Sequence, residues 1–240
     1  MHSPFVFDFI LQVLNNKNNY TAPSAIEILR KQLQNNQEIL DIDDLGAGSR
    51  SGVSKRKSVA QVAHTALKPK KYAELLFRLV KHYQPQTILE LGTSLGITTA
   101  YLAAANPGAT IITIEGSKTI AQKASDHFGR LGLNNITSLQ GNFDTLLPSV
   151  LSGLSTVDMT YIDGNHRYEP TIQYFQQLLG KTHEYSILIF DDIHWSREME
   201  EAWEEIKNHS SVRCTIDIFF LGFVFFRKEF KEKQHFQIRF

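Results

Sequence analysis

The sequence predicts an α/β fold: a doubly wound sheet of seven strands behind an N-terminal helical cap. Three observations predict it. From residue 86 onwards, short β-rich apolar runs alternate with amphipathic helical segments, as in parallel βαβ units. Only a tight turn near Gly222 separates the last two strand-like runs, so these two strands must be antiparallel. Residues 1–85 are polar and helical in pattern, which makes them a separate helical appendage.

The individual elements follow from periodicity. Phe5, Phe9 and Val13 recur at a spacing of four and share one face of a first helix. Ser24 is a candidate N-cap for a second helix, because Glu27 follows it three residues later. Helices are expected over 24–35, 58–66, 70–83, 96–105, 118–131, 143–151, 168–179 and 195–208, a loop over 43–57, and strands over 87–91, 110–115, 136–140, 157–163, 186–191, 212–219 and 222–227. The strands comprise five parallel ones followed by an antiparallel hairpin. We therefore divide the chain into the appendage (1–69), the main α/β domain (70–228) and a tail (229–240).

Composition and charge narrow the classes of function. The 240 residues are 42% hydrophobic and 21% charged, which excludes a disordered, collagen-like or disulfide-stapled chain. Twenty-five basic and 25 acidic side chains cancel, which argues against a general nucleic-acid binder. The apolar run from Ile218 to Phe226 is too short to cross a bilayer as a helix, so no membrane partner is expected. Cys214 is a single cysteine, and the apolar N-terminus lacks a basic n-region, so we expect a packed helix and a cytoplasmic protein.

The exit of the first main-domain strand, Glu90-Leu91-Gly92-Thr93-Ser94-Leu95-Gly96, lies where doubly wound sheets bind ligands. A dinucleotide site would need three glycines, and Ser94 and Ile97 occupy two of those positions. The segment also matches G-x-S-x-G, in which Ser94 would be a hydrolase nucleophile. That nucleophile normally follows several strands and an oxyanion segment, and neither precedes Ser94 here.

A pocket for S-adenosylmethionine (SAM) is the third interpretation. It needs an acid beside the glycine turn, which Glu90 supplies, and a second acid for the ribose hydroxyls, which Glu115 supplies at the end of the next strand. On these residues the chain from about Lys70 to Lys228 resembles the class I SAM-dependent methyltransferases, which have a Rossmann-like fold. It departs from their acid-x-Gly-x-Gly-x-Gly pattern at Ser94 alone.

The resemblance also implies roles for the later turns. The exit of the third main-domain strand resembles the adenine-binding turn of that superfamily, where Asn142 would meet the adenine edge and Phe143 would cover the ring. Phe143 could equally be a core residue, and Ser117 either lines the adenosine side or caps the following helix. The expected cofactor-binding residues are Glu90, Gly92, Thr93, Ser94, Gly96, Glu115, Gly116, Ser117, Gly141, Asn142, Phe143 and Asp163.

A group of acids is expected at the next two strand exits. Asp163 ends one strand, and Asp191 and Asp192 end the other; if the strands are neighbours, their ends lie about 5 Å apart. Three adjacent carboxylates repel, so protonation, a Lys or Arg, or a cation must compensate. Oxygen ligands select a hard ion such as Mg²⁺. In the plainer alternative, the aspartates cap helices and the nearby histidines, His166 and His194, are surface residues.

Asp163-x-x-His166 followed by the paired acids resembles metal-dependent sugar and small-molecule O-methyltransferases. The resemblance implies that Asp163, Asp191 and Asp192 bind Mg²⁺ and that His166, with Asp163, deprotonates the hydroxyl of a small-molecule acceptor; His194 is the second candidate base. Enzymes that methylate nucleobase amines often carry Asn/Asp-Pro-Pro-Tyr/Phe at this exit, whereas this chain has Asp163-Gly164-Asn165-His166.

The segment from Leu45 to Ala73 contains seven Lys or Arg residues and no acid. It is either a solvated loop or, over residues 43–57, a lid that presents positive charge to an anionic acceptor. Because the same positive charge could contact a nucleic acid, a nucleic-acid methyltransferase that binds its substrate through residues 50–71 is an alternative function. A serine hydrolase built on Ser94 and a non-catalytic SAM-binding protein are two further alternatives. The phenylalanine-rich final hairpin is either core or the surface of a homodimer.

Overall fold

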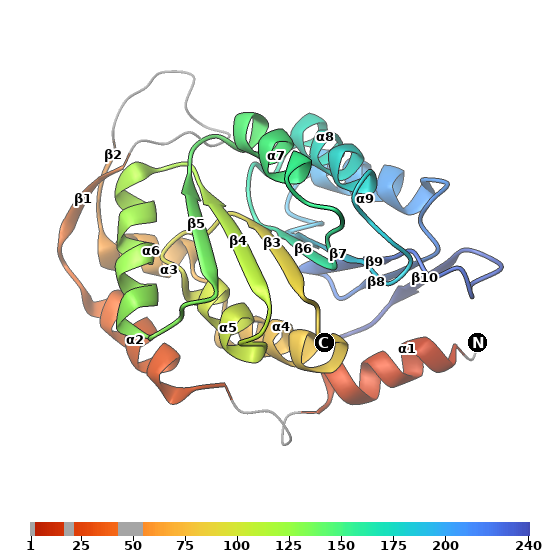
Figure 1. The fold of residues 1–240 in the computed structure, drawn as a ribbon, viewed down its shortest axis with the longest axis horizontal. Helices are drawn as coiled ribbons and strands as arrows, with labels where there is room; N and C mark the ends of the chain where they lie inside the picture. Colours follow the sequence, from red (N-terminus) through yellow and green to blue (C-terminus); the bar gives the residue numbers. More distant parts are fainter. Residues whose placement is uncertain (1–2, 17–21, 43–54) are drawn as a thin grey trace.

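The computed structural model describes residues 3–16, 22–42 and 55–240. Its main feature is an eight-stranded sheet of order β10-β8-β9-β7-β6-β3-β4-β5 (Figure 1). Only β9 runs antiparallel to its neighbours, β7 and β8. The strands are Thr87–Leu91 (β3), Thr110–Glu115 (β4), Ile136–Gln140 (β5), Met159–Ile162 (β6), Ile187–Asp191 (β7), Cys214–Asp217 (β8), Leu221–Phe225 (β9) and Gln234–Gln237 (β10). The predicted doubly wound sheet, with five parallel strands and a final antiparallel hairpin, is confirmed.

Alternate residues of the central strands belong to two apolar clusters, one on each face of the sheet. Ile187 and Ile189 pack with the N-terminal helices, whereas Leu188 and Phe190 pack with the later helices. This follows from the period of two along a strand that is buried on both faces. The helices are Pro4–Phe9 (α1), Ser24–Asn35 (α2), Val59–Ala66 (α3), Lys70–Tyr83 (α4), Ile97–Ala105 (α5), Lys118–Arg130 (α6), Phe143–Ser152 (α7), Tyr168–Leu179 (α8) and Arg197–Asn208 (α9).

The helices of residues 1–85 are built into the first of these clusters. After α1 the chain continues as a π-helical turn (η1, Ile10–Leu14), and Phe9 and Val13 are fully buried. Arg78 on α4 donates from Nε to the carbonyl oxygen of Val13 at 2.7 Å, which satisfies a helix-end acceptor inside the protein. Phe9 and Val13 belong to the first cluster and Phe5 packs against it, so the shared apolar face predicted for this helix is confirmed. The N-terminal helices and the sheet therefore share one core.

Several local predictions are wrong. Pro23, not Ser24, precedes the first residue of α2, and Glu27 bonds Arg30 and Tyr101 instead of forming a capping box. The expected loop 43–57 ends in a strand: Ile39–Ile42 (β1) pairs antiparallel with Lys55–Ser58 (β2). Residues 43–54, which hold most of the predicted lid, lie outside the described residues. The unassigned tail contains β10, which adds a parallel edge strand to β8.

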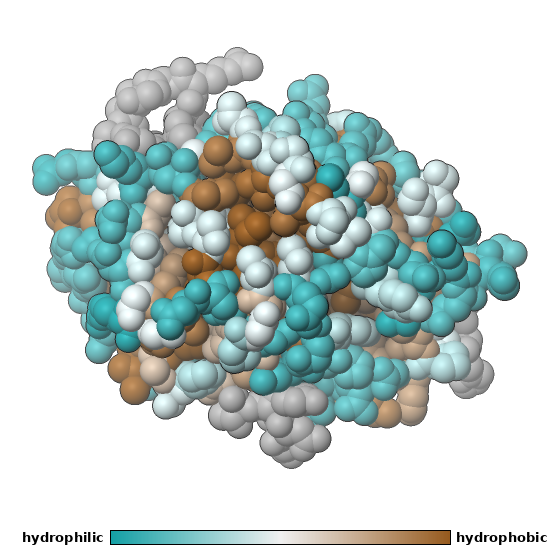
Figure 2. Space-filling model, in the orientation of Figure 1, coloured by the Kyte–Doolittle hydropathy of each residue, from teal (hydrophilic) through white to brown (hydrophobic). Residues whose placement is uncertain are grey.

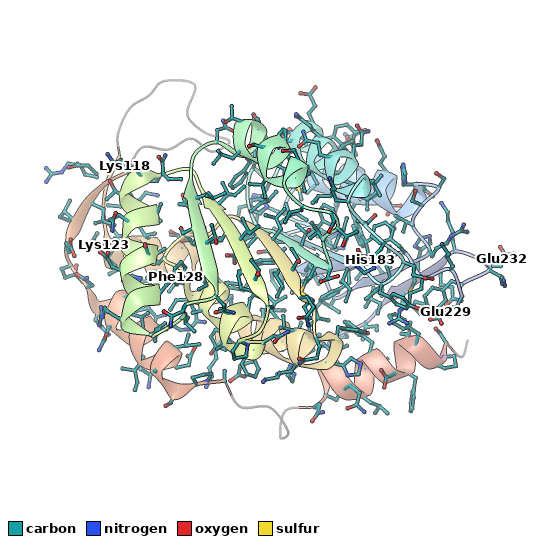
Figure 3. All side chains as sticks on the ribbon, viewed as in Figure 1. Lys118, Lys123, Phe128, His183, Glu229 and Glu232 are labelled. Atoms are coloured by element: carbon teal, nitrogen blue, oxygen red, sulfur yellow. The ribbon has the colours of Figure 1, made fainter. Side chains whose placement is uncertain are left out.

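Apolar side chains gather over the face of β3, β4 and β5 that Figure 2 presents, between α6 and α7. Ile112, Leu139 and Leu146 belong to the partly buried margin of the second cluster. On the opposite flank of α6, Lys118 and Lys123 point outward, whereas Phe128 lies on the side toward the sheet (Figure 3). Phe128 is buried against the exit of β3, where Gly96 leaves room for its ring. Among the described residues, no helix is long and apolar enough to span a membrane.

The turn after β3 requires glycine at position 92, and this requirement can be tested. Its φ is +105°, and an added Cβ would lie 2.0 Å from the carbonyl oxygen of Asp163 on the adjacent strand exit. We expect Gly92→Ala to lower the free energy of unfolding by about 3–5 kcal/mol, because backbone must move to relieve the clash. Gly129→Ala is the matched control: nothing lies within 4 Å of its Cβ position, and alanine favours a helix by up to about 1 kcal/mol. Urea unfolding followed by circular dichroism measures both; equal midpoints would contradict this account of the turn.

Candidate active site

A cavity of about 220 Å³ lies at the carboxyl ends of β3, β4, β5 and β6. Parallel strands bring these ends to one edge, which is where a ligand site was predicted. Ser94 lines a neighbouring hollow that shares Ile42, Glu115 and Ile120 with the cavity. The cavity is lined by Ile42, Gly92, Glu115, Gly116, Ser117, Ile120, Gly141, Asn142, Phe143, Asp163, Gly164, Asn165 and Tyr174. Of the predicted cofactor-binding residues, Glu90, Thr93, Ser94 and Gly96 do not line it.

Glu115 is held in one orientation by backbone donors. Its Oε2 accepts from the amide of Ser94 at 2.8 Å, and its Oε1 accepts from the amide of Ser117 at 3.0 Å. Burial raises the pKa of Glu115, and the hydrogen bonds from Ser117 and Ser94 offset part of that rise. Each carboxylate oxygen keeps a further lone pair, so the carboxylate can still accept from a diol in the cavity.

The exit of β5 presents a polar group and a ring. Asn142 caps α7, because its Oδ1 accepts from the amide of Asp144 at 2.7 Å, which leaves its amide nitrogen as the group able to meet a ligand. The Phe143 ring lies edge-on to Tyr174 with 6.0 Å between centroids, at the cavity wall. Ser117 caps α6 by accepting from the amide of Ile120 and also lines the cavity, so the structure is compatible with both predicted roles.

Glu90 is fully buried and does not line the cavity. Its Oε2 accepts from the hydroxyls of Thr99 at 2.5 Å and Thr113 at 2.6 Å, and Thr113 also bonds Thr93. Its Oε1 has no partner among the described residues. Burial raises the pKa of Glu90 to about 8, and the two threonine hydrogen bonds offset only part of that effect. The acid beside the glycine turn is therefore protonated at neutral pH.

The predicted acidic cluster has a feature that the sequence analysis missed. The ammonium of Lys68, from the link between α3 and α4, forms an ion pair with Oδ2 of Asp191. The Tyr161 hydroxyl lies 2.9 Å from the same oxygen and 3.1 Å from Oδ2 of Asp163. Asp163 and Asp191 are thus brought together as predicted, with a cation and a shared hydroxyl between them. No sequence spacing links Lys68 to these strands, and the only signal was the expectation that a Lys or Arg could compensate the acids.

Burial and the neighbouring carboxylate of Asp163 raise the pKa of Asp191. Burial acts in the same direction on Asp163, but the His166 ring and the Lys68 charge outweigh it and hold the pKa of Asp163 at about 2. Burial alone would lower the pKa of Lys68, yet Asp163 and Asp191 raise it, so Lys68 is an ammonium and not a base.

The predicted Mg²⁺ site does not fit these residues. Asp192 adopts φ +53°, and its amide bonds Phe220 and Oδ1 of Asp191. In the part of the chain that the structure describes, no three His, Cys, Asp or Glu side chains are grouped to hold a metal ion. The three aspartates predicted as ligands are therefore not brought together as a ligand set, and Lys68 supplies the positive charge.

The two candidate bases have different surroundings. His166 lies with Nε2 3.5 Å from Oδ1 of Asp163, and Asp163 lines the cavity. His194 instead bonds Asp217 through Nε2 at 2.9 Å, and its ring stacks on Phe219. The geometry therefore joins only His166 to the Asp163–Asp191 pair. The Ser94 hydroxyl is buried without a hydrogen-bond partner among the described residues, so it lacks the base that a hydrolase nucleophile needs.

Comparison with known families agrees with this geometry. Residues 89–193, from the turn of Glu90 to the end of the acidic cluster, match the family described as "Methyltransferase domain". These residues are a methyltransferase domain. The predicted resemblance to the class I SAM-dependent methyltransferases is confirmed.

Two curated relatives and one solved structure illustrate the similarity. The chain is 32% identical over 77 residues to a tRNA (guanine-N(7)-)-methyltransferase of Mycoplasma mobile and 30% identical over 126 residues to a catechol O-methyltransferase of Niastella koreensis. These matches cover 32% and 51% of this chain, and the chain spans only 38% and 55% of the two relatives. An O-methyltransferase of Bacillus cereus, solved with S-adenosylhomocysteine (SAH), has the same fold: TM-score 0.63, 18% identity, 92% of this chain and 97% of that one.

The burial of Glu90 predicts a pH-dependent stability. Because its pKa is higher in the folded state (about 8) than in an unfolded chain (4.5), the folded protein binds the extra proton between these values and loses stability as pH rises through them. Glu90→Gln has no such proton to lose. We expect it to resemble the parent chain at pH 5 and to be more stable by a few kcal/mol at pH 9, at about 1.4 kcal/mol per pKa unit.

Urea unfolding at the two pH values measures this difference. Glu232→Gln is the control, because Glu232 is an exposed acid in the C-terminal region, remote from the cavity (Figure 3). A Glu90→Gln chain whose stability relative to the parent does not change with pH would show that Glu90 is ionised in the folded protein.

Proposed function

We propose that the protein transfers the methyl group of SAM to a hydroxyl of a small molecule. The observation that carries this proposal is the position of one cavity between two sets of groups. Glu115 and Asn142 offer a fixed acceptor and a free amide on one side, and on the other the cavity is lined by Asp163, whose Oδ1 lies 3.5 Å from Nε2 of His166. The name of the Niastella koreensis relative supports a hydroxyl acceptor.

The lining residues fit SAM by their chemistry. Glu115 would accept from the ribose hydroxyls, and the Asn142 amide would donate to the adenine edge beside the Phe143 ring. Gly92, whose Cβ would strike the backbone of Asp163, keeps the two strand exits close enough to form a single wall. When bound, SAM supplies a methyl group made electrophilic by its sulfonium.

His166 is the base in this proposal. Its Nε2 faces Asp163, so the proton of the neutral ring resides there and Nδ1 is left to accept the acceptor's hydroxyl proton. The carboxylate of Asp163 then stabilises the imidazolium that forms, as the acid does in other His–Asp pairs. The oxygen that remains is a far better nucleophile than the neutral alcohol.

Exposed aromatic rings at the same end of the sheet suit an acceptor with an apolar part. Phe219 lies between β8 and β9 with φ +76°, an unfavourable backbone conformation for a bulky residue, and the residue is 62% exposed. Phe220 beside it is also exposed, and its carbonyl oxygen accepts from the amide of Asp192. A planar acceptor lying against these rings would reach the acidic pair.

The basic segment supports a nucleic-acid acceptor less well. Lys68 is used internally by Asp191, so it does not add to a surface that could bind phosphates. The anionic acceptor and the homodimer stay predictions.

The cofactor half of the proposal is tested by calorimetry with SAM and SAH. We expect Glu115→Ala to weaken binding of either ligand by about 1–3 kcal/mol, the loss of a charge-assisted hydrogen bond. Glu232→Ala, an exposed acid remote from the cavity, is the control and should bind as the parent does. An unchanged dissociation constant for Glu115→Ala would remove the ribose assignment, and a parent chain that binds neither ligand would remove the function.

The transfer half is tested by SAH release with a panel of phenols, catechols and sugar alcohols. We expect His166→Ala to lower the rate constant of transfer by about 10²–10⁴-fold while SAM affinity is retained, because only proton removal is lost. His183→Ala is the matched control: His183 forms another His–Asp pair, with Asp158 at 2.8 Å, and both residues line a different hollow from the cavity. Equal rates in the two variants would exclude His166 as the base.

A further inference from the structure

We propose that Lys68 is the built-in cation of the Asp163–Asp191 pair, and that its ammonium fills the place of a divalent metal ion, so that methyl transfer needs none. The first part concerns the site alone. The second part rests on the proposed function.

The ion pair is an interior one. The Lys68 side chain is 11% exposed and the Asp191 side chain 0%. The Tyr72 ring, on α4, lies edge-on to Phe220 with 5.4 Å between centroids, and the carbonyl oxygen of Phe220 accepts from the amide of Asp192, next to Asp191. A lysine that only covered the surface would keep its ammonium in water, whereas this one has been withdrawn from it.

Every carboxylate oxygen of the pair already faces a protein group. On Asp191, Oδ2 meets the Lys68 ammonium and the Tyr161 hydroxyl, and Oδ1 accepts from the amide of Asp192 at 2.9 Å. On Asp163, Oδ2 faces the same hydroxyl, and Oδ1 faces the ring of His166. A divalent ion bound here would have to share these oxygens with their protein partners and would lie beside an ammonium, which repels it.

The backbone of Lys68 is fixed from the N-terminal helices. Arg30 on α2 donates from Nη1 to the carbonyl oxygen of Lys68 at 2.7 Å and from Nε to Glu27 at 2.8 Å. Glu27 in turn accepts from the hydroxyl of Tyr101 on α5 at 2.6 Å. Two helices, α2 and α5, therefore hold the residue that bears the ammonium, as expected of a built site and not of a mobile side chain.

Manganese titration followed by electron paramagnetic resonance tests the proposal without any acceptor. We expect the parent chain to bind no Mn²⁺ at this site. Lys68→Met removes the ammonium and leaves the two buried acids uncompensated, so its Mn²⁺ affinity should rise by at least about tenfold. Lys68→Met combined with Asp191→Asn should lose that gain. Lys70→Met is the matched control, because Lys70 is an exposed neighbour whose contact is Glu74 at 3.5 Å.

Two outcomes would overturn the proposal. One is stoichiometric Mn²⁺ binding by the parent chain that Asp191→Asn abolishes; this titration needs no lysine variant, so it decides the matter even if Lys68→Met does not fold. The other is a folded Lys68→Met chain that binds Mn²⁺ no better than Lys70→Met. Lys68→Arg, which keeps a cation, should bind as little Mn²⁺ as the parent.

Activity then separates this proposal from the proposed function. If methyl transfer is found, its rate should be the same in chelator and in millimolar Mg²⁺, and a rate that chelator abolishes would overturn the second part. If no acceptor is methylated, the proposed function fails, while the Mn²⁺ titrations still decide whether Lys68 is the cation of the pair.

Discussion

The constraint on which this structure depends is the gathering of carboxyl groups at one edge of a parallel sheet. Parallel strands end together, so Glu115, Asp163 and Asp191, each at or just past the end of its strand, are brought to the same edge by the topology. Such an edge can bind a polar ligand, but only if each acid is balanced by a partner or a proton.

The protein compensates the charge of these acids, and of the buried Glu90 within β3, in three different ways. Glu115 accepts from two backbone amides, which leaves it oriented toward the cavity. Glu90 keeps its proton, because burial between threonine hydroxyls raises its pKa to about 8. Asp191 takes an ammonium from Lys68 and shares the Tyr161 hydroxyl with Asp163. Each solution leaves a different arrangement: Glu115 faces the cavity, Glu90 joins β3 to the Thr99 hydroxyl on α5, and the aspartate pair shares one hydroxyl beside an ammonium.

The sequence predicted those features that depend only on neighbouring residues, such as the buried strands. The buried central strands can be recognised in the sequence by their apolar runs, such as that of β7. The acids at the ends of these strands could therefore be identified before the fold was known. The edge strand β10 could not be recognised, because only every second residue is half-buried and Phe236 is its one apolar side chain. The capping box expected at Ser24 was wrong for a related reason: Glu27 is drawn to Arg30 and to Tyr101, partners that the sequence near α2 does not reveal as competitors.

Lys68 shows why a site is harder to predict than a fold. In the sequence it is one of several basic residues in a polar segment, and its spacing from Asp191 carries no signal, because the two meet only through the docking of the N-terminal helices on the sheet. The acids alone therefore suggested a metal. Once Arg30 fixes the backbone of Lys68, the same acids are satisfied by the chain itself. The N-terminal helices are for this reason part of the site and not a cover over it, since they supply the charge that its aspartates require.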